Sequence, residues 1–326
     1  MSSNVAVSSR VRMARNSSDV PFPIRMTETQ RVQLWQKVCA ALSDGYQALS
    51  VGKTTGTEAT ALTEQHWISA ALLSAPGTRG VLYNKDTGVS VMVNEEDHLR
   101  LQTIKPGLSL NDTLNECQQT EQTLSKSLNF AFDDNLGYLT ACPSNLGTAL
   151  RASVMLHLPS LTESGHLKPI LEAIAKLGVT ARGFYGEGTQ ATGAYYQLSN
   201  QVSLGMTESD IITQLTDIVT SIIAKENAAR TARRDNSQLT WDDRVYRAYG
   251  TLTNAKLISF EEALTQLSIL RMGVLENLFP TLTADAIDTL TAQIGPATLN
   301  HKSGQTLPPQ QRDAYRAELI QQTVNI

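Results

Sequence analysis

A short alternating segment near the start of the chain constrains the fold more than any other feature. Over residues 5–13, valines and Met13 occupy one parity, and Ser8, Arg10 and Arg12 occupy the other. Successive side chains of a strand point to opposite faces, so the segment predicts a strand with an apolar face. Its other face carries two neighbouring arginines. We therefore expect a sheet that buries one side and presents positive charge on the other.

Further segments show strand and helix periodicity. Strand patterns lie at 88–93, 130–141 and 154–158, and the Pro, Asn and Gly residues of 142–147 indicate a loop. Apolar residues at helical spacing indicate helices, and capping boxes mark some of their starts, because a Ser or Thr side chain there binds a free backbone amide. The expected helices begin at Thr27 (with Gln30), Thr207 (with Asp210) and Ser259 (with Glu262), cover 166–177 and 241–249, and follow Pro308 and Pro309.

The composition changes over 229–244, a polar and charge-rich stretch. A chain of 326 residues is long enough for two domains. Strands and helices mix before this stretch, and helical patterns dominate after it. We therefore expect an α/β (α+β) domain over 1–230 and a helical domain over 231–326.

Bulk composition excludes some classes of protein. A hydrophobic fraction of 41% and a charged fraction of 18% are typical of a packed soluble core. The net charge of −4 argues against a dedicated nucleic-acid binder. Three scattered cysteines favour a reducing compartment over a disulfide framework. The first residues lack the apolar region of a signal peptide, and no run approaches the roughly 18 apolar residues of a membrane span, so we expect a cytoplasmic protein.

Arginines recur at strand-like positions, and this distribution suits phosphate. Arg10 and Arg12 share a face, Arg100 follows an acidic cluster, Arg151 follows a loop, and Arg182 precedes a glycine-rich turn. A guanidinium group donates two parallel hydrogen bonds and keeps its charge. The sequence has neither a Walker loop nor the glycine loop, lysine strand and H-R-D loop of protein kinases. The arginines alone therefore indicate an anion site and nothing more specific.

The acidic cluster belongs to the string Asn-Glu-Glu-Asp-His-Leu-Arg, which ends at Arg100. If the chain stays extended there, alternate residues, including Glu96, His98 and Arg100, point the same way. Glu95 and Asp97 then point to the opposite face. We therefore expect Glu96 to lie on the same face as Arg100, and its two acidic neighbours to be structural.

Four strings carry a resemblance to a known family. They are Ser-Ser-Arg-Val-Arg-Met-Ala-Arg-Asn at 8–16, Val-Asn-Glu-Glu-Asp-His-Leu-Arg at 93–100, Leu-Thr-Ala-Cys-Pro-Ser-Asn-Leu-Gly-Thr at 139–148 and Leu-Arg-Ala-Ser-Val at 150–154. In this order they resemble the catalytic domain of the guanidino (phosphagen) kinases. The resemblance implies a mainly antiparallel sheet flanked by helices, and transfer of the ATP γ-phosphate to a guanidino group.

The resemblance also implies roles for single residues. Glu96 would grip and orient the acceptor guanidinium, which is a poor nucleophile because its pKa exceeds about 12. Cys142 would contact the same group. Mg²⁺ would bridge the phosphate oxygens, and no side chain is assigned to it. The residues implied to surround the ATP phosphates are Arg10, Arg12, His98, Arg100, Arg151 and Arg182; for His98, a hydrogen-bonded strand residue is the alternative.

One position departs from the family pattern. After Gly-Glu-Gly-Thr, at 186–189, the family carries a second glutamate that shares the guanidinium clamp, and this chain has Gln190. A glutamine accepts a hydrogen bond without supplying negative charge. Glu187 is a candidate to compensate, so both residues are candidate contacts for the substrate guanidinium.

Within the family, the bacterial protein-arginine kinases are most similar. The strings at 182–189, 243–250 and 312–317 resemble that branch. The first arginine strand begins almost at Met1, so we expect the helical lobe that encloses a free amino acid in small-molecule kinases to be absent. The last string implies that Arg312, Asp313 and Arg316 bind phosphoarginine, since residues four apart on a helix lie one turn apart. A surface helix is the alternative.

The resemblance implies a protein-arginine kinase that marks proteins for the ClpC–ClpP protease and acts in the heat-shock response. Its substrates would be unfolded proteins and a repressor of the CtsR type, and a McsA-type activator would be its partner. The helical domain would form a homodimer. The alternatives are a small-molecule arginine kinase, or a phosphoarginine-binding adaptor with weakened catalysis, in which Gln190 marks the loss.

Overall fold

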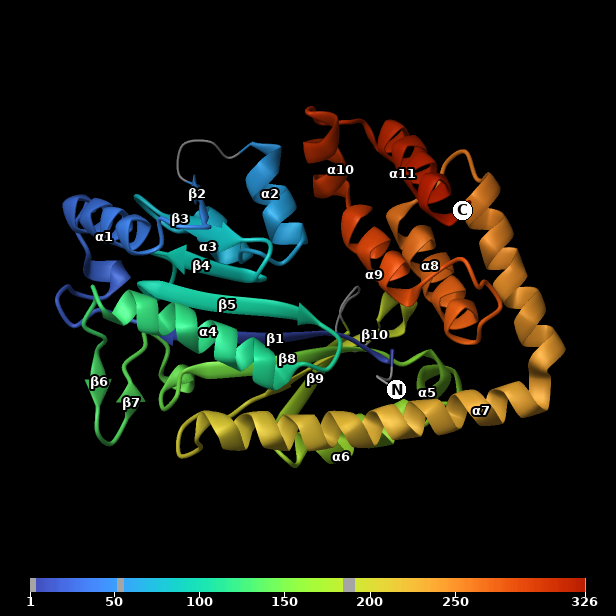
Figure 1. Ribbon diagram of the computed structural model, residues 1–326, viewed down its shortest axis with the longest axis horizontal. Helices are drawn as coiled ribbons and strands as arrows, with labels where there is room; N and C mark the ends of the chain where they lie inside the picture. Colours follow the sequence, from blue (N-terminus) through green and yellow to red (C-terminus); the bar gives the residue numbers. More distant parts are fainter. Residues whose placement is uncertain (1–3, 52–55, 184–190, 326) are drawn as a thin grey trace.

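A computed structural model describes residues 4–51, 56–183 and 191–325. Eight strands form one sheet in the order β2-β3-β4-β5-β1-β8-β10-β9, and every adjacent pair is antiparallel. The expected antiparallel sheet with flanking helices is confirmed (Figure 1). The strands are β1 (Ala6–Arg15), β2 (Gln47–Ser50), β3 (Gly80–Asn84), β4 (Val89–Val93), β5 (Leu99–Pro106), β8 (Leu150–His157), β9 (Val179–Gly183) and β10 (Tyr195–Asn200), with a separate hairpin of β6 (Phe132–Asp133) and β7 (Gly137–Tyr138).

Helices pack on both faces of the sheet and at one end of it. Short 3-10 turns, η1 (Pro23–Arg25), η2 (Pro143–Asn145) and η3 (Thr192–Ala194), join some of the elements. The helices are α1 (Glu28–Ala41), α2 (Thr57–Glu64), α3 (Ala70–Ser74), α4 (Leu110–Ser125), α5 (Pro159–Glu163), α6 (Leu167–Ala175), α7 (Glu208–Asn254), α8 (Phe260–Leu275), α9 (Ala284–Gln293), α10 (Pro296–Ser303) and α11 (Pro309–Val324).

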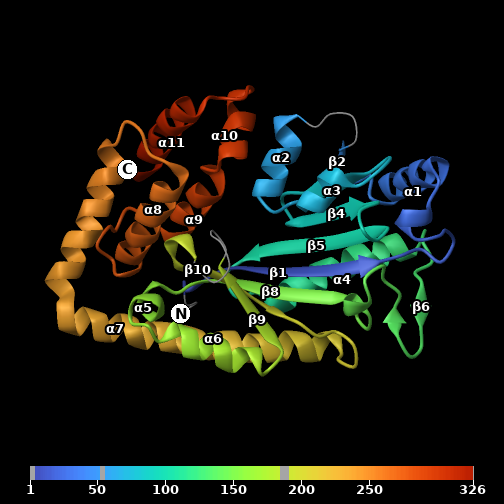
Figure 2. The same ribbon diagram turned by 180° about the vertical axis from the view of Figure 1, so that it is seen from behind.

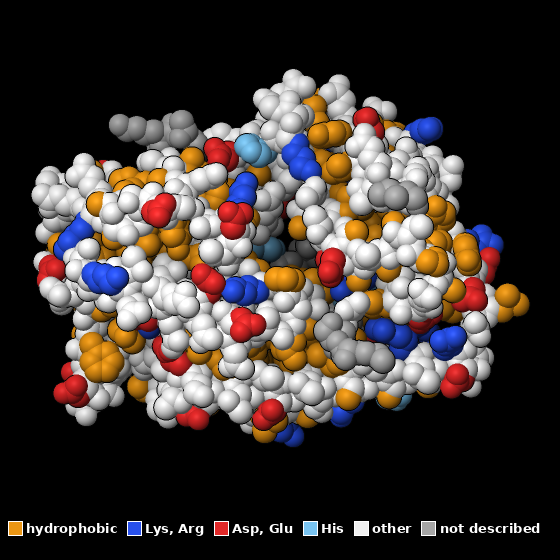
Figure 3. Space-filling model, in the orientation of Figure 1, with side chains coloured by type: hydrophobic (Ala, Val, Ile, Leu, Met, Phe, Trp, Pro, Cys, Tyr) orange, Lys and Arg blue, Asp and Glu red, His pale blue; other side chains and the backbone are white. Residues whose placement is uncertain are grey.

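The apolar face of the sheet packs against α4 and the first part of α7, which run across it in Figure 1. Val11 and Met13 of β1 are fully buried in this core, as their parity predicts. Burial of such aliphatic side chains stabilises the fold by about 1.5–3 kcal/mol each. In the space-filling view of this side, acidic and basic side chains are interspersed (Figure 3).

The opposite face of the sheet is divided along its length. Over β3 and β4, α2 and α3 cover it through a second core that includes Leu62, Leu72 and Met92. Figure 2, seen from behind, shows β5, β1 and β8 on this side beyond α2 and α3. The strands in this middle part of the sheet carry four of the five predicted arginines, and Arg182 lies on the edge strand β9.

The second part of α7 and helices α8, α9 and α11 enclose a separate core that includes Leu252, Leu267 and Ile320. The predicted boundary at 230/231 falls inside α7, so one helix continues from one region into the other. The backbone leaves the helical conformation at Ser237 (φ −153°, ψ 37°), where the helix turns (Figure 1). The division into two domains stays a prediction.

Local capping signals agree with the structure. Thr27 and Thr207 form the expected reciprocal capping boxes, and Ser259 accepts from the amide of Glu262. One element prediction was wrong. The segment 130–141 forms only the short β6–β7 hairpin, because the Asp133 carboxylate accepts from two amides and closes a turn. The helix expected over 241–249 is confirmed, and it is the continuation of α7.

Candidate active site

The arginines on the strands converge on one face of the sheet. In the register of β1 and β8, Arg12 lies directly opposite Arg151, and Arg10 lies two residues away on the same face. Arg100 of β5 faces the same way because it lies opposite Ala14. Arg182 of β9 also belongs to this face through its pairing across β10. The structure thus brings together the five arginines predicted to bind phosphate; we call them the arginine row.

The arginine row has an excess of positive charge. Burial, followed by the charges of Arg10, Arg100 and Arg151, lowers the pKa of Arg12 to about 8. Burial, followed by Arg100 and Arg151, lowers the pKa of Arg10 to about 10. Within the described residues, the buried Nε atoms of Arg12 and Arg151 have no hydrogen-bond partner. Since guanidinium stays protonated at neutral pH, these features fit a site that a polyanion completes.

The acidic segment before Arg100 is a bend rather than an extended strand, which corrects the parity argument. Asn94 adopts a left-handed backbone conformation (φ 61°). Its side-chain Nδ2 donates to the backbone carbonyl oxygens of Arg31 (3.2 Å) and Thr78 (2.9 Å). Asparagine tolerates this conformation better than most residues. Alternate side chains of the segment therefore do not share one face.

His98 is fully buried, with both ring nitrogens close to backbone atoms. Its Nδ1 accepts from the amide of Ser17 (3.0 Å), so Nε2 carries the proton and donates to the Pro21 carbonyl oxygen (2.9 Å). Burial lowers the pKa of His98, which favours this neutral form. The placement favours the hydrogen-bonded alternative over the predicted contact with ATP.

The three acidic side chains of the bend differ in their surroundings. Glu95 is buried and accepts from Ser69 Oγ (2.7 Å) and Arg100 Nη1 (3.0 Å). Asp97 is buried and accepts from Asn16 Nδ2 (2.6 Å) and the amide of Ala141 (2.7 Å). Glu96 is exposed. Glu95 and Asp97 hold the bend together, and Glu96 remains exposed.

Glu96 opens onto a cavity of about 270 Å³ at one end of the arginine row. Arg12, Arg100 and Arg151 line it, together with Cys142 at the start of η2. Cys142 is half-buried, and its Sγ lies 3.0 Å from Ser144 Oγ. The predicted catalytic residues, Glu96 and Cys142, therefore share a cavity with three of the predicted phosphate ligands.

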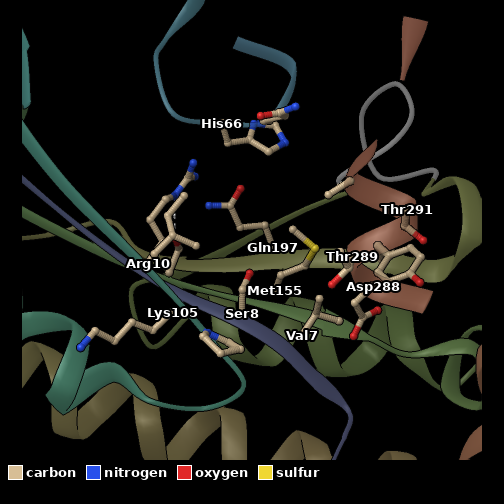
Figure 4. Close-up of a pocket in the computed structure, with 16 residues that line it drawn as sticks. Val7, Ser8, Arg10, His66, Lys105, Met155, Gln197, Asp288, Thr289 and Thr291 are labelled. Atoms are coloured by element: carbon tan, nitrogen blue, oxygen red, sulfur yellow. Dashed lines mark hydrogen bonds between the residues drawn. The ribbon is translucent and has the colours of Figure 1, made fainter. Parts of the chain in front are cut away.

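A second cavity of about 300 Å³ lies at the other end of the row, beside Arg10 (Figure 4). Met155 and Gln197 of the sheet form its floor, and α9 forms a side wall. His66, at its top, was not identified from the sequence, where it follows a helix without any motif. Its backbone is left-handed (φ 64°), and burial, followed by Arg10 and Arg12, lowers its pKa to about 4. Such conformations are frequent at ligand sites.

The residues predicted to bind phosphoarginine lie on α11, far along the chain from the arginine row. Arg316 is almost fully buried and donates to the carbonyl oxygens of Ile294 (2.9 Å) and Ile258 (2.8 Å) and to Asp313 (2.5 Å). Arg312 is half-buried. Two donors of Arg316 are thus committed to the backbone, and the phosphate clamp stays a prediction.

Two parts of the predicted site are not represented in this geometry. Glu187 and Gln190 lie outside the described residues. Within the described part of the chain, no group of three His, Cys, Asp or Glu side chains could hold a metal ion. No helix there combines the length and apolar composition needed to cross a bilayer.

Comparisons with known proteins agree with the resemblance. Residues 30–229 match the ATP:guanido phosphotransferase C-terminal catalytic domain, and residues 238–326 match the protein-arginine kinase McsB C-terminal domain. The protein-arginine kinase of Caldanaerobacter subterraneus subsp. tengcongensis is 41% identical, over 99% of this chain and 97% of its own. That of Brevibacillus brevis is 39% identical, over 99% of this chain and 93% of its own.

Solved structures share the fold. The duplicated taurocyamine kinase from Schistosoma mansoni, with bound transition-state analogue components, superposes with a TM-score of 0.63 at 29% identity. The match covers 81% of this chain and 39% of that longer one. A lombricine kinase superposes with a TM-score of 0.60 at 27% identity, over 70% of this chain and 68% of its own. The chain therefore belongs to the ATP:guanido phosphotransferase family, in the branch of the protein-arginine kinases.

Proposed function

We propose that this protein transfers the γ-phosphoryl group of ATP to arginine side chains of other proteins. The observation that carries the proposal is a row of five arginines whose positive charge exceeds the single charge of Glu95, which pairs with Arg100. The row lies between two cavities, one of which holds Glu96 and Cys142. Electrostatic stabilisation and positioning supply most of the catalysis in phosphoryl transfer. Membership of the protein-arginine kinase branch supports a protein-bound acceptor.

The two cavities suggest how ATP lies in the site. The triphosphate would follow the arginine row, because its charge relieves the repulsion among the guanidinium groups. The acceptor would enter the cavity that contains Glu96, since a cation fits beside a carboxylate. The nucleoside would then occupy the cavity beside Arg10 and His66, at the other end of the row.

In the reaction, a guanidinium nitrogen attacks the γ-phosphorus. The new N–P bond forms while the bond from phosphorus to the β,γ-bridging oxygen breaks, and ADP leaves with that electron pair. The proton lost from nitrogen passes to the Glu96 carboxylate, which also aligns the nucleophile. Mg²⁺ bound to the nucleotide would neutralise developing charge on the phosphate oxygens, and those oxygens and water would be its ligands.

The remaining predictions are proposals that rest on the family. We propose a cytoplasmic protein with a catalytic domain over 1–230, and with homodimerisation and phosphoarginine binding in 231–326. Unfolded proteins and a repressor of the CtsR type would be substrates, a McsA-type protein the activator, and ClpC–ClpP the protease that removes marked proteins. Three free cysteines support a reducing compartment.

The direct test uses γ-labelled ATP with Mg²⁺. An unfolded arginine-rich protein is offered in one reaction and free arginine in another, each with the wild type and with Glu96→Ala. Acid-labile label on the protein, lost in the variant, is the expected result, since a phosphorus–nitrogen bond hydrolyses in acid. Label only on free arginine would favour the small-molecule kinase. No label in either reaction, even with an activator, would favour the phosphoarginine-binding adaptor.

A further inference from the structure

We propose that the helical C-terminal region completes the nucleotide site, with α9 as a wall of the nucleoside cavity and Asp288 as the acceptor for a ribose hydroxyl. The inference rests on the proposed function, because it takes the cavity beside Arg10 as the nucleoside site. The inference goes beyond the proposed function, because it assigns a nucleotide contact to α9, a helix outside the sheet domain.

The side chains around this cavity differ from wall to wall. In Figure 4, Asp288 and Thr289 of α9 lie on the side opposite Arg10, and Met155 lies between them on the sheet. Met155 offers an apolar, polarisable surface that suits a flat base. Asp288 and Thr289 offer polar groups that suit a sugar. The cation of Arg10 marks the end nearest the phosphates.

Asp288 is held in place before any ligand binds. Both its oxygens accept from Arg271 of α8, Oδ1 from Nε and Oδ2 from Nη2, each at 2.7 Å. Arg271 is buried and also donates to the carbonyl oxygen of Asn4 (2.8 Å). A carboxylate has about four acceptor positions, so one bidentate arginine leaves capacity for a hydroxyl donor. The Asp288 side chain retains 16% exposure, and this residue lines the cavity.

The helical region is attached to the sheet domain on both sides of the cavity. On one side, Ser268 of α8 shares a hydrogen bond with the buried His157 of β8 (2.7 Å). On the other, the Glu64 carboxylate of α2 accepts from the amides of Ala297 (3.1 Å) and Thr298 (2.7 Å) at the start of α10. Glu64 precedes His66 by two residues. These attachments preform the wall, which lowers the cost of ordering it on binding.

The charge of Asp288 decides which part of a nucleotide it meets. A carboxylate repels phosphate, and the arginine row already attracts it at the opposite end of the cavity. Ribose hydroxyls, in contrast, donate well to carboxylates, as in dinucleotide-binding folds. A hydrogen bond to a charged group contributes enough to change affinity about tenfold or more. Asp288 therefore suits the ribose, and α9 makes the C-terminal region part of the nucleotide site.

The test measures binding to the full-length protein by calorimetry, with three probes in the presence of Mg²⁺: ADP, 2′,3′-dideoxy-ADP and tripolyphosphate. Thr289→Trp places a bulky ring in the cavity, and Thr231→Trp, at an exposed position on α7, is the matched control. Asp288→Asn removes the charge and keeps one acceptor for Arg271. Thermal melting establishes that each variant is folded.

We expect Thr289→Trp to weaken ADP binding at least tenfold and to leave tripolyphosphate binding unchanged, while Thr231→Trp changes neither. We expect Asp288→Asn to weaken ADP about tenfold, with dideoxy-ADP binding equal in the wild type and the variant. Folded Thr289→Trp and Asp288→Asn proteins with wild-type affinity for ADP would overturn the inference. If Arg12→Gln still lost ADP binding in that case, the proposed function would stand without it. A wild type that binds neither ADP nor tripolyphosphate would overturn both.

Discussion

Replacement of Arg12 by glutamine should stabilise the ligand-free protein and abolish the further stabilisation that bound nucleotide gives the wild type. Arg12 is half-buried beside three other arginines, and burial together with their charges lowers its pKa well below the ordinary value, to about 8. At 1.36 kcal/mol per unit, this is about 6 kcal/mol of unfavourable interaction with the charged form. Lost packing of the side-chain stem offsets part of the gain, so we expect a net increase in unfolding free energy of about 1–3 kcal/mol.

The sign of the pH dependence follows from the same shift. From about pH 8 up to the ordinary pKa of arginine, the unfolded chain binds a proton at Arg12 that the folded protein has lost, so wild-type stability rises with pH there. Below pH 8 the folded and unfolded states both hold the Arg12 proton, and the free-energy cost of the buried charge no longer changes with pH. The advantage of Arg12→Gln is therefore complete at neutral pH and decreases above pH 8.

The assay is thermal and denaturant unfolding with and without ADP and Mg²⁺. Each kcal/mol moves the melting temperature by about 2–4 °C in proteins of 150–250 residues. ADP at 100 times its dissociation constant should add about 2.7 kcal/mol to the wild type and nothing to the variant. Arg25→Gln, at an exposed position, controls for the change in net charge. A ligand-free Arg12→Gln protein less stable than the wild type would refute the electrostatic reasoning.

Three further predictions concern single side chains. Glu96→Gln should lower turnover by about 10²–10⁴-fold without changing ADP affinity. Steady-state kinetics measures the turnover, and calorimetry measures the affinity for ADP. Weaker ADP binding with unchanged turnover would contradict the proposed role of Glu96. Iodoacetamide should inactivate the enzyme at Cys142, and ATP should protect it. The reagent attacks thiolates, and burial disfavours the thiolates of the other two cysteines, because it raises the pKa of Cys117 to about 12 and raises that of Cys39. Peptide mapping that finds the label on another cysteine when activity is lost would refute this. The pKa of His66 is lowered from 6.5 to about 4, so the unfolded state binds more protons than the folded state between these pH values. As pH falls through that window, the wild type should therefore lose about 3 kcal/mol more stability than His66→Asn. Parallel curves of stability against pH for the two proteins would contradict this prediction.

The parts of the site that could be predicted from sequence depend on local rules. The alternation in β1 places Arg10 and Arg12 on one face whichever strands lie beside it. The capping boxes at Thr27 and Thr207 depend only on residues three apart. These predictions needed no knowledge of distant partners, and the structure agrees with them.

The parts that could not be predicted depend on contacts between distant segments. The bend at Asn94 is held by carbonyl oxygens of Arg31 and Thr78, which no periodicity of its own segment reveals. The cavity beside Arg10 combines His66 with strands of the sheet and with α9. Sequence patterns identify elements separately, and a cavity at the junction of three of them has no pattern of its own.

The bend also explains how two adjacent glutamates come to differ. Glu95 turns inward, where Ser69 and Arg100 compensate its charge and it partly offsets the repulsion felt by Arg12. Glu96 remains exposed at the cavity, and the bend directs it away from the contacts that hold Glu95. An extended strand would place these neighbours on opposite faces of the sheet. A bend closed by Asn94 places both at the same cavity, so that one carboxylate pairs with Arg100 and the other stays exposed, as its proposed contact with a cationic acceptor requires.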